Sequence, residues 1–175
     1  MKETLKEVLK YSLILSSICL VASGLLAGVY SFTQSRIAAE TQAGIDANLK
    51  QVLPNVSRFE AVKAEGEILY YKGYSKENKF IGVAFTALAK GYSSIIDTLV
   101  GMSASGEITG VKVINQNETP GLGTRVSENS FLSQFVNKNI NSLSGVQTVS
   151  GATISSRAVI ESVRKRIEQI QKILK

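Results

Sequence analysis

The stretch from Tyr11 to Ser35 contains no charged residue, and it constrains this chain more than any other part of its sequence. Residues 11–32 are long enough for a helix to cross the hydrocarbon core of a bilayer, which takes about 20 apolar residues. Tyr30 lies near the far end, where interfacial aromatic side chains are favoured. The alternative is a cleaved signal peptide, because Ala22-Ser23-Gly24 resembles a cleavage site, but such a peptide has an apolar core of only about 7–15 residues. We therefore predict a retained transmembrane helix over 11–32.

The basic residues that flank this segment predict its orientation. Three lysines lie within residues 1–10, whereas Arg36 is the one basic residue that follows the segment closely. By the positive-inside rule, residues 1–10 lie in the cytoplasm and residues 33–175 form an extracytoplasmic domain. The sequence thus predicts a single-pass protein of the inner (cytoplasmic) membrane, in contact with the lipid bilayer.

The absence of histidine and the presence of a single cysteine, Cys19, exclude several classes of catalytic and metal site. No Ser-His-Asp or Cys-His triad can form, and no histidine-containing zinc or haem site is possible. One cysteine cannot hold an iron–sulfur cluster, and the acidic residues are scattered. We therefore assign no catalytic residue and no metal ligand. An organic redox cofactor fits this composition, because the cofactor itself carries the chemistry.

The formal net charge of +6 does not indicate a nucleic-acid partner. Six of the basic residues lie within 157–175, where cations near a helix end interact favourably with the helix dipole and form a solvated face. The same face could instead meet anionic lipid headgroups or an acidic partner protein. No basic patch is interleaved with aromatic residues, so we expect no nucleic acid among the partners.

Hydrophobic periodicity predicts an α+β domain behind the membrane segment. Apolar residues at helical spacing predict a helix over 37–53 that ends before Pro54, because the residue before proline disfavours helical geometry. A C-terminal helix of about nineteen residues is predicted as well, with Ser155 or Ser156 capping its first turn. The predicted strands are Glu67–Tyr74, Phe80–Leu88, Ile95–Met102, Ile108–Asn115 and Val146–Val149, and Ser127–Val136 is predicted as a short helix. We expect one mainly antiparallel sheet flanked by helices.

The run Ser150-Gly151-Ala152-Thr153-Ile154-Ser155-Ser156-Arg157 presents one threonine hydroxyl immediately before the C-terminal helix. The start of a helix has unpaired N–H groups and positive dipole charge, which favour a phosphate group. Gly151 and Ala152 leave room for a bulky ligand close to the backbone. Taken alone, the run also fits an ordinary turn and helix cap. A phosphorylated cofactor could be held or accepted here.

Three motifs carry a resemblance to a known family. Ser150-Gly151-Ala152-Thr153 followed by x-Ser-Ser resembles the flavinylation motif of FMN-binding domains in the Rnf and Na+-translocating NADH:quinone oxidoreductase (Nqr) complexes. Glu118-Thr119-Pro120-Gly121-Leu122-Gly123 is similar to the family's second signature, and Gly91-Tyr92-Ser93-Ser94-Ile95-Ile96 to a third. Their order and spacing resemble the G subunit of the Rnf complex most closely, over essentially the whole chain. One position departs from the pattern: Gln147 stands where the family usually has an acid, six residues before the acceptor threonine.

The resemblance implies that a separate flavin transferase esterifies Thr153 with the phosphate of FMN, so that the cofactor is covalent. It also implies which residues surround that cofactor. These are Ser150, Gly151, Ala152 and Ile154 at the phosphate, with backbone N–H groups of residues 154–156, and Glu118, Thr119, Leu122, Gly123, Tyr92 and Ser93 along the ribityl chain and ring. Tyr92 could instead pack in the core or at the rim, and Asp97 and Arg125 receive no role.

The function implied by the resemblance is that of an electron-relay subunit. Such a protein passes electrons through FMN between membrane subunits of an ion-translocating oxidoreductase of the Rnf type, and it is not catalytic alone. Two other classes fit the residues: a stand-alone, membrane-anchored flavoprotein reductase, and a cofactor-free binding or assembly module in which both motifs are turns. The sequence does not distinguish Na+ from H+ as the coupling ion.

Overall fold

The computed structural model describes the backbone of residues 2–64 and 66–174, and the side chains of residues 6–34, 44–64 and 66–174. The chain divides into two compact units, Met1–Gly44 and Ile45–Lys175. The first unit contains most of helix α1, Lys2–Val52, and the second contains the end of α1 together with the rest of the fold. Within α1, Lys6–Gln34 is long and apolar enough to cross a membrane, with a mean hydropathy of 2.1.

Helix α1 runs through the predicted boundary between two separate helices. The helix predicted over 37–53 continues from the apolar segment without interruption, and it ends at Val52, shortly before Pro54, as predicted. The side chains of Arg36, Ile37 and Ala38, on which the predicted orientation and amphipathic pattern partly rest, lie outside the described residues.

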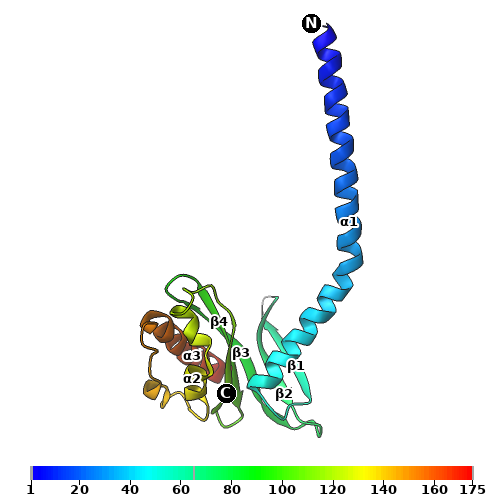
Figure 1. The fold of residues 1–175 in the computed structure, drawn as a ribbon. Helices are drawn as coiled ribbons and strands as arrows, with labels where there is room; N and C mark the ends of the chain where they lie inside the picture. Colours follow the sequence, from blue (N-terminus) through cyan, green and yellow to red (C-terminus); the bar gives the residue numbers. More distant parts are fainter. Residues whose placement is uncertain (1, 65, 175) are drawn as a thin grey trace. The chain divides into compact units, whose positions relative to one another are not determined.

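Five antiparallel strands form one sheet in the order β1-β2-β3-β4-β5. Neighbours in sequence are also neighbours in space, so the sheet is a simple meander (Figure 1). The strands are β1 Arg58–Ala64, β2 Glu67–Tyr74, β3 Phe80–Lys90, β4 Ile95–Ser103 and β5 Ile108–Asn115. The mainly antiparallel sheet is therefore confirmed, and β2 and β5 have the predicted bounds.

Three local predictions differ from the structure. The sequence does not predict β1, which lies at the sheet edge, keeps most of its side chains exposed and therefore shows no apolar alternation. The strand predicted over Val146–Val149 is wrong: this segment has no ladder partner among the described residues, and the Gln147 N–H group donates to Gln134 Oε1 at 2.8 Å instead.

The short helix predicted over Ser127–Val136 is broken into separate turns. These are η1 Gly123–Ser127, α2 Asn129–Leu132 and η2 Ser133–Phe135, and η3 Leu143–Gly145 follows.

Helix α3, Thr153–Leu174, covers one face of the sheet and builds the larger core. Its buried side chains recur every three or four residues and pack against inward-facing residues of β3, β4 and β5. The helix contributes Val159, Val163, Ile167 and Ile170, and the strands contribute Val83, Phe85, Ile96, Val100, Met102 and Ile108. Full burial of each such side chain stabilises the fold by about 1.5–3 kcal/mol. The predicted cap is wrong, because Ser155 and Ser156 lie inside the helix with buried side chains.

The end of α1 packs on the opposite face of the sheet. In this smaller core, Leu49 and Val52 of α1 contact Ala84 of β3 and Leu99 of β4. Gly101 allows this close contact, because a Cβ atom there would overlap the carbonyl oxygen of Val52. That same oxygen accepts a hydrogen bond from Thr109 Oγ1 at 2.6 Å. The last turns of α1 are thus fixed directly on the sheet.

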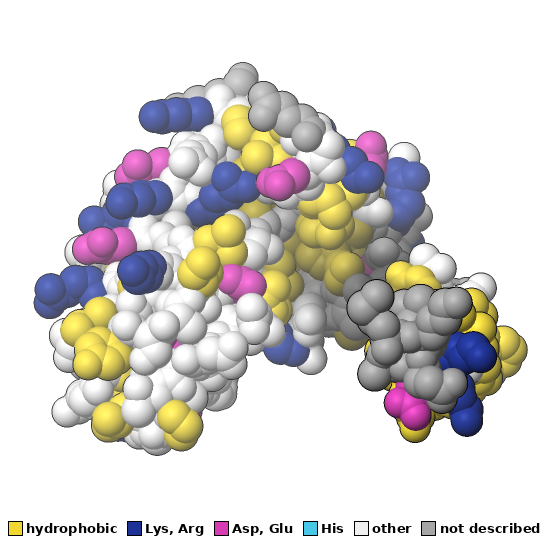
Figure 2. Space-filling model, turned by 90° about the horizontal axis from the view of Figure 1, so that it is seen from above, with side chains coloured by type: hydrophobic (Ala, Val, Ile, Leu, Met, Phe, Trp, Pro, Cys, Tyr) yellow, Lys and Arg dark blue, Asp and Glu magenta, His cyan; other side chains and the backbone are white. Residues whose placement is uncertain are grey.

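Charged side chains of both signs are spread over the surface. On the face shown in Figure 2, lysine and arginine side chains are interspersed with acidic, polar and hydrophobic ones and do not form one continuous basic block.

Candidate functional site

A cavity of about 510 Å3 opens where the three sequence motifs meet. Its lining comes from the turn after β3, the loop before η1 and the start of α3. The lining residues are Tyr92, Glu118, Thr119, Leu122, Gly123, Gly151, Ala152, Thr153 and Ile154. Two other predicted site residues, Ser93 and Ser150, lie beside the cavity and do not line it. The fold thus gathers segments that are far apart in the sequence around one pocket.

Glu118 joins these three segments. Its side chain is only 4% exposed, and its carboxylate accepts backbone N–H groups of Tyr92 at 3.1 Å, Ser93 at 3.0 Å and Ser94 at 2.8 Å. The Ser155 hydroxyl, in the first turn of α3, donates to Glu118 Oε2 at 2.6 Å. One carboxylate therefore positions the 91–94 turn and the start of α3 relative to its own loop.

The environment keeps this carboxylate ionised. Burial alone would raise the pKa of Glu118, but the hydrogen bonds from Ser155 and from the backbone of residues 94, 93 and 92 together outweigh that effect and lower the pKa to about 2. Both oxygens are occupied by donors of the protein itself. Glu118 lines the cavity, and its contribution is to hold the walls in place.

Two motif glycines fit closely around the Glu118 carboxylate. A Cβ atom on Gly91 would lie 2.6 Å from Oε1, and one on Gly123 would lie 2.8 Å from Oε2. Either methyl group would displace the carboxylate or open the loop. Gly91 of the third motif and Gly123 of the second are therefore required by the buried acid, in addition to leaving space for a ligand.

Thr153 is the first residue of α3, and its side chain is exposed to the cavity mouth. The Ser156 N–H group bonds to the Ala152 carbonyl at 2.9 Å, so the first intrahelical hydrogen bond starts there. The N–H groups of residues 153–155 have no backbone partner among the described residues. The predicted set of N–H groups, 154–156, is thus shifted by one residue. A hydroxyl and three free donors converge at this helix start.

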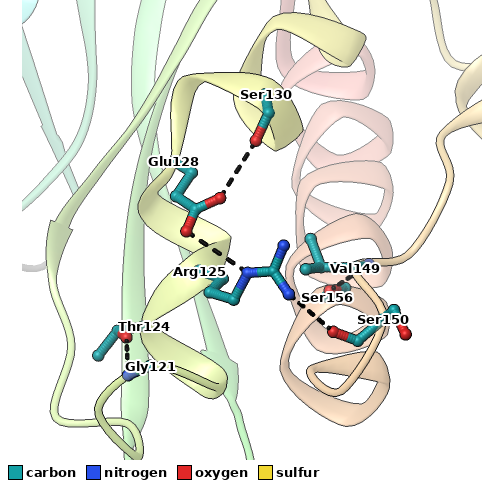
Figure 3. A network of polar contacts seen from close by, with 8 residues as sticks. All are labelled: Gly121, Thr124, Arg125, Glu128, Ser130, Val149, Ser150 and Ser156. Carbon is teal, nitrogen blue, oxygen red and sulfur yellow. Dashed lines mark hydrogen bonds and ion pairs between the residues drawn. The ribbon is translucent and has the colours of Figure 1, made fainter.

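Arg125, to which the sequence assigns no role, connects the two walls of the cavity. Figure 3 shows its guanidinium between η1 and the turn before α3: Nη1 donates to the Ser150 carbonyl at 3.1 Å, and Nε lies 3.4 Å from Glu128 Oε1. In the same network Ser156 Oγ accepts the Val149 N–H group at 3.1 Å. The sequence signal was a basic residue two positions after the second motif, but no pattern shows which carbonyl it meets.

Apolar surface remains uncovered at the cavity. Tyr92 is 70% exposed, Leu122 50% and Ile154 58%. Ser93 Oγ lies 3.4 Å from Thr119 Oγ1 and adds a polar contact at the edge, whereas Asp97 accepts a hydrogen bond from Asn115 on the sheet, outside the cavity. Among the described residues, no group of three His, Cys, Asp or Glu side chains could hold a metal ion. The site offers exposed apolar side chains beside a helix start with unpaired N–H groups, which suits an aromatic ligand with a phosphate.

Comparison with known proteins gives this combination a family context. The FMN-binding domain family matches residues 91–168, which include all three motifs, and the RnfG N-terminal region family matches residues 1–52. Both matches coincide with elements described above: the cavity and α3 in the first case, α1 in the second.

Three curated relatives cover almost the whole chain. The G subunit of the proton-translocating ferredoxin:NAD(+) oxidoreductase complex of Clostridium ljungdahlii is 33% identical over 87% of this chain and 85% of its own length. The G subunit of the ion-translocating oxidoreductase complex of Methanosarcina acetivorans is 31% identical over 94% and 95%. The Na(+)-translocating counterpart of Acetobacterium woodii is 30% identical over 97% and 95%. Relatives named for either ion are thus about equally similar to this chain.

Two solved structures share the fold at low sequence identity. The C subunit of the Na(+)-translocating NADH-quinone reductase of Parabacteroides distasonis superposes with a TM-score of 0.53 and 17% identity, over 73% of this chain and 91% of that one. NqrC of Shewanella oneidensis gives 0.50 and 20%, over 70% and 72%. The α+β architecture is therefore that of these proteins.

Proposed function

This chain belongs to the family of G subunits of ion-translocating oxidoreductase complexes of the Rnf type, and from that premise we propose that it relays electrons between other subunits through FMN esterified to Thr153. Family membership and the FMN-binding domain make it an electron-transport subunit of such a complex. The observation that carries the finer proposal is the cavity itself, where the exposed Thr153 hydroxyl stands beside three N–H groups without a backbone partner among the described residues.

The residues present fit FMN. The start of α3 supplies N–H donors and dipole charge for the phosphate, and a cavity of about 510 Å3 is in the usual range for a cofactor. Tyr92, Leu122 and Ile154 offer apolar contact to an aromatic ring. Bound FMN would supply the electron-transfer chemistry, and the protein would supply its position and surroundings.

Attachment to Thr153 requires an external enzyme. In the ester, Thr153 Oγ1 replaces the leaving group on the flavin phosphate, so the donor must be an activated flavin phosphate such as a flavin dinucleotide. The hydroxyl proton also has to be removed. Among the described residues, Glu118 is the only carboxylate on the cavity lining, and with a pKa of about 2 it is a poor base. A flavin transferase would therefore supply the base as well as the flavin donor.

The proposal includes a membrane position. Residues 11–32 would cross the membrane, residues 1–10 would lie in the cytoplasm, and residues 33–175 would lie outside it, next to other membrane subunits of the complex. Support comes from the apolar character of Lys6–Gln34 and the lysines at the start of the chain. A covalent link would prevent loss of FMN in a compartment that the cytoplasmic flavin pool does not reach.

The test is to produce the full chain with and without a flavin transferase and to examine denatured protein for flavin fluorescence on a gel. We expect fluorescence only with the transferase, loss of the signal in Thr153→Ala, and retention in Thr148→Ala, a matched change at a nearby exposed threonine. Covalent flavin in Thr153→Ala would rule out this acceptor. A stand-alone reductase would instead reduce a soluble acceptor without the other subunits.

A further inference from the structure

The two outer edges of the sheet are protected against pairing with other chains. Strand β1 carries Arg58, Glu60 and Lys63 and has a register shift next to Lys63. Strand β5 is bonded at its start to the following segment, where Ile108 N–H donates to the Lys138 carbonyl at 2.8 Å. Charges, irregular register and covering segments are the usual ways to block an edge strand.

A third edge lies inside the sheet, because β2 and β3 separate. Their pairing ends at Tyr71↔Ala84, although β2 begins at Glu67 and β3 continues to Lys90, paired throughout with β4. The ribbons of β2 and β3 diverge beyond this point in Figure 1. A cavity of about 540 Å3 lies here, with residues of β2, β3 and α3 on its lining.

The register shows which backbone groups face this opening. The Gly91 N–H group donates to the Ser94 carbonyl at 2.8 Å, so Gly91 and Ser94 form a hydrogen-bonded pair at the end of the β3–β4 hairpin. Because hydrogen-bonded and non-hydrogen-bonded pairs alternate along antiparallel strands, residues 85, 87 and 89 bond to β4. Thr86, Leu88 and Lys90 then direct their N–H and C=O groups toward the gap, where no described residue bonds to them.

The opposite side of the gap has one carbonyl already bonded. By the same alternation Leu69 of β2 faces the gap, and its oxygen accepts a hydrogen bond from Arg166 Nη2 of α3 at 3.0 Å. Arg166 Nε is buried without a hydrogen-bond partner among the described residues. Lys165, Ser162 and Gln169 complete the polar surface of α3 along the cavity, and Glu67 is the one acidic residue on its described lining.

We propose that the Thr86–Lys90 edge of β3 is a docking surface for an extended, acidic segment of another subunit of the complex. An extended backbone is the ligand that matches N–H and C=O groups repeating at every second residue. This edge is less protected than the outer edges: Thr86 and Leu88 are uncharged, Leu88 is 65% exposed, and the one charged side chain, Lys90, stands at its end. Lys165 and Arg166 line the floor without an ion-pair partner among the described residues, which favours acidic side chains on the segment.

Hydrogen exchange tests this directly, because each amide reports its own hydrogen bond. The full chain is compared in detergent alone and within the purified complex. Alone, the amides of Thr86, Leu88 and Lys90 should exchange fast while those of residues 85, 87 and 89 are protected. In the complex, the three fast amides should slow at least about 100-fold, as expected for amides that enter a stable ladder. Unchanged fast exchange at these positions in the complex would overturn the proposal, whether or not FMN is bound.

A proline substitution separates strand pairing from simple covering of the surface. Thr86→Pro removes an N–H group that faces the gap and leaves the bonds to β4 intact, as proline does on natural edge strands. It should reduce recovery of the chain with the complex at least tenfold, whereas Thr86→Val should not. Far-UV circular dichroism verifies the fold. Normal assembly of a folded Thr86→Pro chain would contradict strand pairing.

A charge reversal addresses the acidic character of the segment and does not depend on the proline variant. Lys165→Glu should weaken assembly several-fold, and the effect should shrink at high salt because exposed charges are screened. Lys172→Glu, which changes an exposed lysine of α3 outside this cavity, is the matched control. Equal assembly of both variants would show that the segment is not acidic.

Discussion

At the scale of single residues, the site depends on a buried charge that has no cation beside it among the described residues. Glu118 is balanced by hydrogen bonds from four residues, which supply three backbone N–H groups and the hydroxyls of Ser94 and Ser155. The sequence indicates that Glu118 belongs to the site, because it opens a recognisable motif. It does not indicate that the carboxylate faces inward, since that depends on the register of three distant segments. Arg125 was missed for the same reason.

Glu118→Gln should destabilise the fold by about 2–4 kcal/mol, because charge-assisted hydrogen bonds are lost and an amide NH2 group is placed against N–H donors. Urea unfolding of the full chain in detergent measures this. Glu128→Gln, at an exposed acid that pairs with Arg125, should cost less than about 1 kcal/mol. Equal losses of unfolding free energy in the two variants would show that the Glu118 carboxylate does not hold the three segments together.

The same carboxylate predicts a pH dependence. Its pKa is lowered from 4.5 to about 2 in the folded chain, so the unfolded chain binds the proton more readily. The stabilisation is complete above pH 4.5 and should be lost progressively as the pH falls toward 2. Urea midpoints measured from about pH 6 to about pH 2.5 should therefore fall more steeply for the wild type than for Glu118→Gln. Parallel curves would contradict the lowered pKa.

Arg125→Gln should slow flavin attachment several-fold with little effect on stability, because it removes the bond that holds the Ser150 carbonyl while leaving the core untouched. A time course of covalent fluorescence with a fixed amount of transferase measures the rate. Arg157→Gln, at an exposed arginine of α3, serves as a control for general charge effects. A similar reduction of the attachment rate in both variants would indicate a general charge effect and not the loss of the hydrogen bond from Arg125 to the Ser150 carbonyl.

At the scale of elements, prediction succeeded where a strand or helix buries one regular face. Strands β2 to β5 have apolar residues on the core side and polar turns between them, and α3 has a regular apolar stripe. Strand β1 was not predicted because an exposed edge strand carries charged residues and shows no apolar alternation. Val146–Val149 was wrongly predicted as a strand because a short apolar run also fits an extended segment that packs without pairing. The close contact between the end of α1 and the sheet leaves no periodic signal, only isolated glycines.

Gly101→Ala tests that contact. The new methyl group would overlap the Val52 carbonyl and push the end of α1 from the sheet, at a cost of about 1–3 kcal/mol. Gly145→Ala is the matched control, because its Cβ atom would meet nothing closer than 3.6 Å among the described residues. Thermal unfolding of both variants measures the difference, and an unaffected Gly101→Ala chain would show that α1 does not approach the sheet so closely.

At the scale of the whole molecule, helix α1 connects an apolar segment to the FMN-binding domain. The proposed topology predicts that a cysteine at Lys76, an exposed position in the β2–β3 turn, reacts with a membrane-impermeant thiol reagent in cells with a permeable outer envelope. Cys19→Ser provides the background for this labelling. Reaction only after lysis of the inner membrane would place the domain in the cytoplasm, and loss of the N-terminal segment from the mature chain would indicate a cleaved signal peptide.

The central claim is that Thr153 carries FMN, and peptide mass mapping of the purified full chain tests it most directly. After co-expression with a flavin transferase, the peptide that contains Thr153 should gain the mass of one FMN less one water, and fragmentation should place that mass on the threonine. The same peptide from cells without the transferase should be unmodified. An unmodified Thr153 in transferase-treated chain, or a flavin mass on another residue such as Ser155, would contradict the account.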